Sequence, residues 1–85
     1  MSITLLSEYF DSWDPMQFIK DGAPKGEYSV EAADVVLKYQ DTMSDADLAE
    51  LVYKEFTESM EIDPDGFKDE SLARASEIRE AIKAS

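Results

Sequence analysis

Apolar side chains recur three or four residues apart along most of this chain, whereas the strict alternation typical of a half-buried strand fails in every segment. Spacings near 3.6 residues place side chains on one face of an α-helix, and a strand needs a period of two. Glycine and proline, which interrupt helices, are confined to Pro15, residues 22–26 and residues 64–66. The pattern predicts an all-α fold with short connections, and only Lys25–Tyr28 leaves room for a minor hairpin.

Four apolar stripes predict four main helices, and a shorter segment predicts a one-turn helix after Trp13. Ser29 and Ser44 are the expected N-caps of the second and third helices, with Asp47 as the reciprocal acid of the third. Residues 1–85 are therefore expected to form a single helical domain, a compact bundle with a radius of gyration of about 12 Å. The stripes are Leu6, Tyr9, Phe10 and Trp13; Val30, Ala33, Val36 and Leu37; Leu48, Leu51, Val52, Phe56 and Met60; and Phe67, Leu72, Ala75, Ile78 and Ile82.

The segment Trp13-Asp14-Pro15 predicts that a helix restarts at this point. Asp14 is expected to accept backbone N–H bonds as an N-cap, and Pro15 at the first helical position loses only an N–H that would be unpaired anyway. Gln17 completes a variant of the capping box, so the turn would run from Pro15 to Asp21. On this interpretation, Asp14→Ala costs about 0.5–2 kcal/mol of stability and Asp14→Asn much less. Trp13 is the expected structural anchor of an aromatic-rich core cluster, with a partner-binding patch as the alternative.

The composition excludes several kinds of chemistry, because the chain contains no cysteine and no histidine. A thiol nucleophile, a disulfide framework, a zinc site of the usual kind and an imidazole base are thereby ruled out. The sequence also lacks a glycine-rich phosphate loop and a nucleophile motif. We therefore expect a non-enzymatic protein with no catalytic residues, no cofactor and no bound metal.

The segment Glu61-Ile62-Asp63-Pro64-Asp65-Gly66 invites comparison with a calcium-binding loop. Oxygen-bearing side chains fall at loop positions 1, 3 and 5, and glycine falls at position 6. The bidentate glutamate that position 12 requires is replaced by Leu72, and Pro64 interrupts the loop. A turn with helix-capping carboxylates is the better interpretation, and a calcium sensor or a small metal-dependent enzyme is the alternative from another functional class.

Acidic residues dominate the charge, with 20 Asp and Glu against 8 Lys and Arg and a net charge of −12. Such a charge argues against nucleic acid or an anionic membrane as a direct ligand. Eleven acidic and two basic residues lie between Asp41 and Glu70. On the helix capped by Ser44, helical spacing places four acids in one stripe. The stripe is either a docking face for a basic protein partner or a solvated face. These acids are Asp47, Glu50, Glu58 and Glu61.

The expected location is the cytoplasm, because no apolar run approaches the roughly 20 residues of a membrane span. The first residues, Met1–Thr4, also lack the basic region of a signal peptide. A homodimer formed through leftover apolar surface is a further alternative, and no heptad pattern decides the matter.

The opening Trp13-Asp14-Pro15-Met16, followed by Phe18 and later by Tyr28, resembles a group of small bacterial helical proteins that form a domain family of unknown function. These proteins share a Trp-Asp-Pro-(Met or Ile)-Gly opening, a middle helix with an aromatic and acidic end, similar to Tyr53–Met60, and a last helix similar to Leu72–Ser85. Gln17 stands where the family has glycine, and the loop at Lys20–Glu27 is longer.

This resemblance implies a bacterial helical domain and supplies no catalytic residues. Some similar proteins are toxin-immunity proteins, which suggests a narrower hypothesis. The chain would then neutralise a basic, nuclease-like toxin, and charge steering would accelerate the association.

Overall fold

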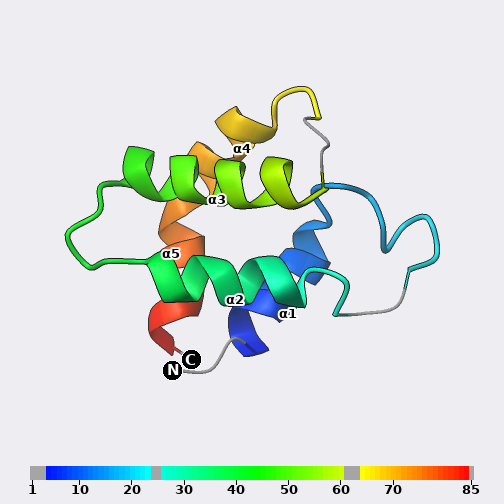
Figure 1. Ribbon diagram of the computed structural model, residues 1–85, viewed down its shortest axis with the longest axis horizontal. Coiled ribbons are helices and arrows are strands. Elements are labelled where there is room, and N and C mark those ends of the chain that lie inside the picture. Colours follow the sequence, from blue (N-terminus) through cyan, green and yellow to red (C-terminus); the bar gives the residue numbers. More distant parts are fainter. Residues whose placement is uncertain (1–3, 24–25, 61–63, 85) are drawn as a thin grey trace.

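The computed structural model describes residues 4–23, 26–60 and 64–84, and all regular secondary structure within these ranges is α-helical. This confirms the all-α prediction. The helices of the described residues are α1 (Thr4–Trp13), α2 (Ser29–Lys38), α3 (Asp45–Met60), α4 (Phe67–Ala73) and α5 (Ala75–Ala84) (Figure 1).

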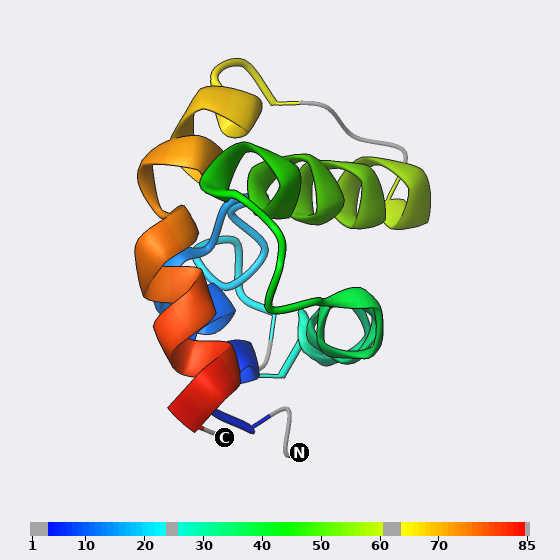
Figure 2. The ribbon, with the colours of Figure 1, turned by 90° about the vertical axis from the view of Figure 1, so that its left-hand side faces the viewer.

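The helices form two layers around a common core. Helices α2 and α3 lie side by side and run in opposite directions in one layer, and α1 and α5 contact each other in the other (Figures 1 and 2). Helix α4 packs on α3. The radius of gyration is 11.7 Å, as the chain length predicts. The buried core comprises Leu6, Phe10, Met16, Tyr28, Ala32, Val35, Leu48, Val52, Phe56, Phe67, Ala75, Ile78 and Ile82.

Helix α3 begins with the capping box that the sequence predicts. The Ser44 hydroxyl accepts a hydrogen bond from the Asp47 N–H at 3.1 Å, and the Asp47 carboxylate accepts one from the Ser44 N–H at 3.4 Å. Helix α2 differs, because its N-cap residue is Tyr28 and no side chain caps it. Ser29, the expected cap, is instead the first helical residue.

The one-turn helix predicted after Trp13 is not formed, and residues 15–16 and 18–22 make turns on either side of Gln17. Asp14 and Gln17 adopt left-handed φ values of 52° and 61°, which are incompatible with a right-handed helix. Local hydrogen bonds of mixed spacing replace the helical ladder, such as Gly22 N–H to the Ile19 carbonyl and Ala23 N–H to the Phe18 carbonyl. The Asp-Pro pair therefore marks the exit from α1 and does not restart a helix.

The last predicted helix is divided at Arg74 into α4 and α5. Arg74 has φ −99° and ψ 1°, and its N–H still donates to the Glu70 carbonyl, so the break is a sharp bend. Leu72, predicted to face the core, is 49% exposed, and Ser71 is fully buried in its place. The Ser71 hydroxyl donates to the Phe67 carbonyl at 2.9 Å, which satisfies its hydrogen-bonding need within the core.

Helix α2 turns to the core a face that only partly matches the predicted one, because of the predicted residues Val36 packs against the core but Val30 and Leu37 do not. Ala32 and Val35 are fully buried, whereas Val30 is 62% and Leu37 82% exposed. Two polar contacts with α3 hold this rotation. The buried Glu31 carboxylate accepts a hydrogen bond from the Ser59 hydroxyl at 2.7 Å, and Lys38 forms an ion pair with the largely buried Glu55. Because α2 has apolar residues on two faces, these long-range contacts decide which face is buried.

Candidate functional site

Asp14 joins the end of α1 to the turns that follow it. Its N–H continues the helical pattern by donating to the Phe10 carbonyl at 2.7 Å. One carboxylate oxygen, Oδ1, accepts hydrogen bonds from the Tyr28 hydroxyl and from the Ile19 N–H at 3.1 Å. The other, Oδ2, accepts the Lys20 N–H at 2.9 Å. The carboxylate thus binds backbone N–H groups, as expected of a cap, but those groups lie five and six residues further along and outside any helix.

These hydrogen bonds determine the ionisation of both side chains. Burial opposes the charged form of Asp14, but the Tyr28 hydroxyl and the backbone N–H groups outweigh it and hold the pKa of Asp14 below its usual value. Burial and the hydrogen bond to Asp14 raise the pKa of Tyr28 well above the ordinary range, so its hydroxyl stays a donor. The Tyr28 ring is fully buried and stacks on Phe18 and Phe56, with ring centroids 5.9 and 5.7 Å away.

Trp13, the last residue of α1, contacts α4 and the bend that separates α4 from α5. Its ring is 5.5 Å from the Phe67 ring, and its Nε1 donates to the Glu70 carboxylate at 3.3 Å. The Arg74 guanidinium lies 4.8 Å from the centroid of the Trp13 ring, within cation–π range. Arg74 also donates to the Tyr9 hydroxyl at 3.2 Å, so it links α1 to the bend. Trp13 thus makes the contacts of a structural anchor.

Several hollows of about 250 to 400 Å³ open on the surface, and one of them adjoins Trp13 and Asp14. This hollow, of about 330 Å³, is lined by Trp13, Asp14, Pro15, Gln17, Lys20, Glu70 and Arg74. In this hollow, the two carboxylates of Asp14 and Glu70 are balanced by the two cations of Lys20 and Arg74. The carboxylate of Asp14 is already occupied by three donors, so this hollow offers little attraction to a cation.

Three of the four acids of the predicted docking stripe, Asp47, Glu50 and Glu58, lie on α3 and are exposed or half-exposed. Asp47 takes part in the capping box, and Glu50 forms an ion pair with Lys68 at 3.1 Å. The fourth acid, Glu61, lies outside the described residues. The structure therefore places three of the predicted side chains along one helix and engages two of them in contacts within the fold.

A second hollow, of about 400 Å³, lies between the start of α3 and the connection that precedes it. Two acids of the stripe, Asp47 and Glu50, share this hollow with the apolar side chains of Met43 and Leu51 and with the ammonium of Lys54. Gln40 and Thr42 complete the lining. An apolar wall next to carboxylates suits the long aliphatic stem and charged head of an arginine or lysine side chain.

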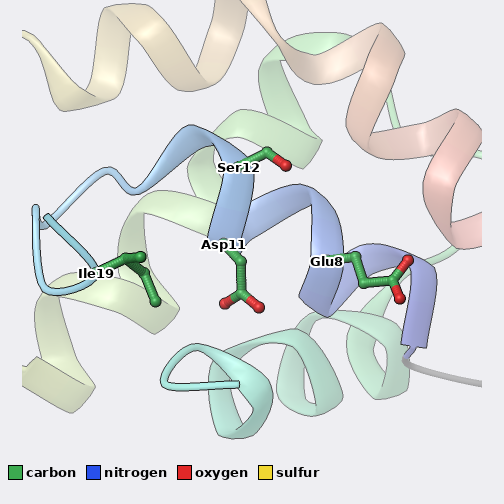
Figure 3. Close-up of a pocket in the computed structure, with 4 residues that line it drawn as sticks. All are labelled: Glu8, Asp11, Ser12 and Ile19. Atoms are coloured by element: carbon green, nitrogen blue, oxygen red, sulfur yellow. The ribbon is translucent and has the colours of Figure 1, made fainter. Parts of the chain in front are cut away.

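A third hollow, of about 360 Å³, lies beside α1 and is lined by Glu8, Asp11, Ser12 and Ile19 (Figure 3). Asp11 points from α1 toward the space that Ile19 also faces (Figure 3). Its Oδ2 accepts the Gly26 N–H at 3.0 Å, and its Oδ1 is buried without a hydrogen-bond partner among the described residues. The bond to Gly26 ties α1 to the turn before α2.

No group of three or more acidic side chains within residues 4–23, 26–60 and 64–84 is placed to hold a metal ion. Glu61 and Asp63 of the calcium-like segment lie outside these ranges, so the calcium alternative rests on the sequence alone. Leu72, at the position of the missing bidentate ligand, belongs to α4 and is half-exposed.

Sequence reasoning missed the roles of Tyr28 and Arg74. Tyr28 lies 14 residues from Asp14, and Arg74 lies 65 residues from Tyr9, so neither contact has a local spacing that predicts it. A single aromatic residue at the end of a glycine- and proline-rich loop was the available signal for Tyr28.

No family model, curated protein or solved structure matches this chain. The resemblance to bacterial domains and toxin-immunity proteins therefore stays a prediction. In the part of the chain that the structure covers, no helix has both the length and the apolar character to cross a membrane.

Proposed function

We propose that this protein is a non-enzymatic binding module that acts in the cytoplasm and docks a basic protein through the outward face of α3. The observation that carries the proposal is the hollow in which Asp47 and Glu50 lie next to Met43 and Leu51. A basic side chain of the partner would place its aliphatic stem on the apolar wall and its charge beside the carboxylates. Glu58, about two turns further along α3, extends the same acidic face.

The net charge of −12 supports the proposal, because it would steer a basic partner toward this protein and speed association at low salt. The two carboxylates of the hollow outnumber its one ammonium, that of Lys54. The ion pair of Glu50 with Lys68 is half-exposed on both sides, and such pairs contribute little to stability. Glu50 can therefore exchange Lys68 for a partner's cation at small cost.

The test compares two double variants that change the net charge equally, from −12 to −8. The docking variant carries Glu50→Lys and Glu58→Lys, and it spares Asp47 because that residue caps α3. The control carries Asp21→Lys and Glu80→Lys, at exposed positions outside α3. Each immobilised protein captures partners from an extract of the cells that make it, and the captured proteins are quantified by mass spectrometry.

We expect the native chain and the control to capture basic proteins that the docking variant does not capture. For a purified partner, the docking variant should associate more slowly, and its association rate should depend less on salt. A captured nuclease that the native chain inhibits would narrow the function to toxin neutralisation. Unchanged binding of every captured protein by the docking variant would overturn the proposal and leave this face a solubilising surface.

A further inference from the structure

The outward face of α2 carries an apolar stripe whose two large side chains are left exposed by the described fold, with the half-buried Ala33 between them. Val30, Ala33 and Leu37 are spaced three and four residues apart, so they lie on one side of the helix. Val30 and Leu37 are the most exposed large apolar side chains of the described residues. Large apolar side chains stabilise a fold chiefly when they are buried. Because Val30 and Leu37 are exposed, they add little to the stability of this fold.

The fold holds this stripe in place at its surface. Ala32 and Val35 on the opposite face are fully buried. The contacts of Glu31 with Ser59 and of Lys38 with Glu55 tie α2 to α3 near both ends of α2. To turn Leu37 inward, α2 would have to break both contacts and expose the buried Glu31. The stripe is therefore a fixed feature of the folded protein.

Charge is distributed unequally on the two sides of the stripe. Asp34 lies one turn from both Val30 and Leu37. On the same side, Glu55 pairs with Lys38, and Asp34 and Glu58 also act on the Lys38 charge. Three carboxylates thus face one ammonium. The other side presents Ser29, which carries no charge.

We propose that this face of α2 docks an amphipathic, basic helix of a partner protein. Apolar side chains of that helix would pack on Val30, Ala33 and Leu37, and its lysine or arginine residues would lie on one flank, beside Asp34 and Glu58. A second copy of this chain fits poorly, because each copy carries a net charge of −12 and a two-fold contact would bring like carboxylates together. The inference rests on the proposed preference for a basic protein and adds the helical form of the partner and a second surface, on α2, which borders the α3 face at Glu58.

The probe is a synthetic helix of about five turns, or about 18 residues, with leucine on one face and lysine on the rest. A scrambled peptide of equal composition and a peptide with glutamate in place of lysine serve as peptide controls. Binding to the full chain is measured by isothermal titration calorimetry, and the contacted residues are mapped by amide chemical shifts in NMR. The test variant is Val30→Ser with Leu37→Ser, and its matched control is Leu5→Ser with Leu72→Ser, which alters exposed leucines on other helices.

We expect the amphipathic basic peptide to shift the amides of α2 and to bind the test variant about tenfold more weakly, or worse, because the apolar contact is lost. The control variant should bind as the native chain does. Equal binding of the scrambled peptide, or unchanged binding by the test variant, would overturn the inference. Self-association of the native chain that the test variant abolishes would also overturn it, in favour of a homodimer.

This experiment tests Val30 and Leu37, which the α3 proposal does not use, and it leaves intact both Glu50 and Glu58, the acid that the two surfaces share. Suppose that the test variant still binds the peptide, whereas the variant with Glu50→Lys and Glu58→Lys no longer binds its captured partner. The proposed function then stands and the α2 inference fails. The reverse result would place docking on α2 alone.

Discussion

Asp14 has three donors around one carboxylate, and this number changes what a substitution at that position should do. A simple helix cap needs a single acceptor, which asparagine also provides. Here the Tyr28 hydroxyl and the Ile19 N–H converge on one oxygen, and the Lys20 N–H donates to the other. An asparagine amide has only one oxygen, so its NH₂ group would face a donor.

We therefore expect Asp14→Asn to destabilise the protein almost as much as Asp14→Ala, by about 1.5–3 kcal/mol, the range for hydrogen bonds to a charged group. This replaces the sequence-based expectation that asparagine is much better tolerated. Urea unfolding followed by circular dichroism measures both free energies. Asp21→Asn, at an exposed position in the same segment, is the control and should change little. An Asp14→Asn protein as stable as the native one would restore the simple capping interpretation.

The lowered pKa of Asp14 also predicts how stability depends on pH. The folded state favours the ionised carboxylate, so its contribution is fully present above the unfolded pKa of about 3.9. That contribution is lost as the pH falls through the lower pKa of the folded state. The difference in unfolding free energy between the native protein and the Asp14→Asn variant should therefore shrink between about pH 6 and about pH 3. A difference that stays constant over this range would show that the charge of Asp14 is not stabilising.

Among the helices, the features that the sequence predicts correctly are local ones. The pairing of Ser44 with Asp47 lies within three residues, and it forms as expected. Helical periodicity also located the buried Leu48, Val52 and Phe56 of α3. The stripe acids Asp47, Glu50 and Glu58 were placed on α3 by the same spacing.

The features that the sequence does not predict depend on distant partners. Helix α2 has two apolar faces, and the choice between Val35 and Leu37 as core residues depends on contacts with Ser59 and Glu55 of α3. The bend at Arg74 accompanies contacts with Tyr9 and Trp13 of α1. The hollow beside Asp47 and the exposed stripe on α2 follow from tertiary packing, so no local pattern reveals them.

The two serines at the starts of α3 and α2 provide a matched pair of substitutions. Ser44→Ala removes the acceptor for the Asp47 N–H and should cost about 1 kcal/mol, as for other N-caps. Ser29→Ala should change stability little, because no side chain caps α2. Thermal unfolding of both variants checks the difference. Equal losses would mean that the hydroxyl of Ser44 does not act as a cap.

For the whole molecule, the excess of negative charge opposes the compact state. The net charge of −12 lies within a radius of gyration of 11.7 Å, close to the screening length of about 10 Å at 0.1 M salt. Many of the acids therefore repel one another at low ionic strength. The ion pairs Lys38–Glu55, Lys68–Glu50, Arg79–Asp45 and Lys83–Asp41 engage four of the 20 acidic residues, and the net charge of −12 already includes their cations.

Salt should therefore stabilise the protein. Raising sodium chloride from about 0.05 to about 0.5 M should increase the melting temperature, because screening weakens the repulsion more than it weakens the few ion pairs. The control with Asp21→Lys and Glu80→Lys, of net charge −8, should respond less. A melting temperature that is flat or falls with salt would mean that the ion pairs outweigh the repulsion.

Trp13 is the sole tryptophan of the chain, and it contacts Phe67, Arg74 and Glu70. It is therefore a spectroscopic reporter of the contact between the end of α1 and α4. Its intrinsic fluorescence follows the contact between α1 and α4, whereas far-ultraviolet circular dichroism averages over every helix. If the helices unfold as one cooperative unit, the two signals give coincident unfolding curves. A fluorescence transition at lower urea would show that α4 leaves α1 while the other helices persist.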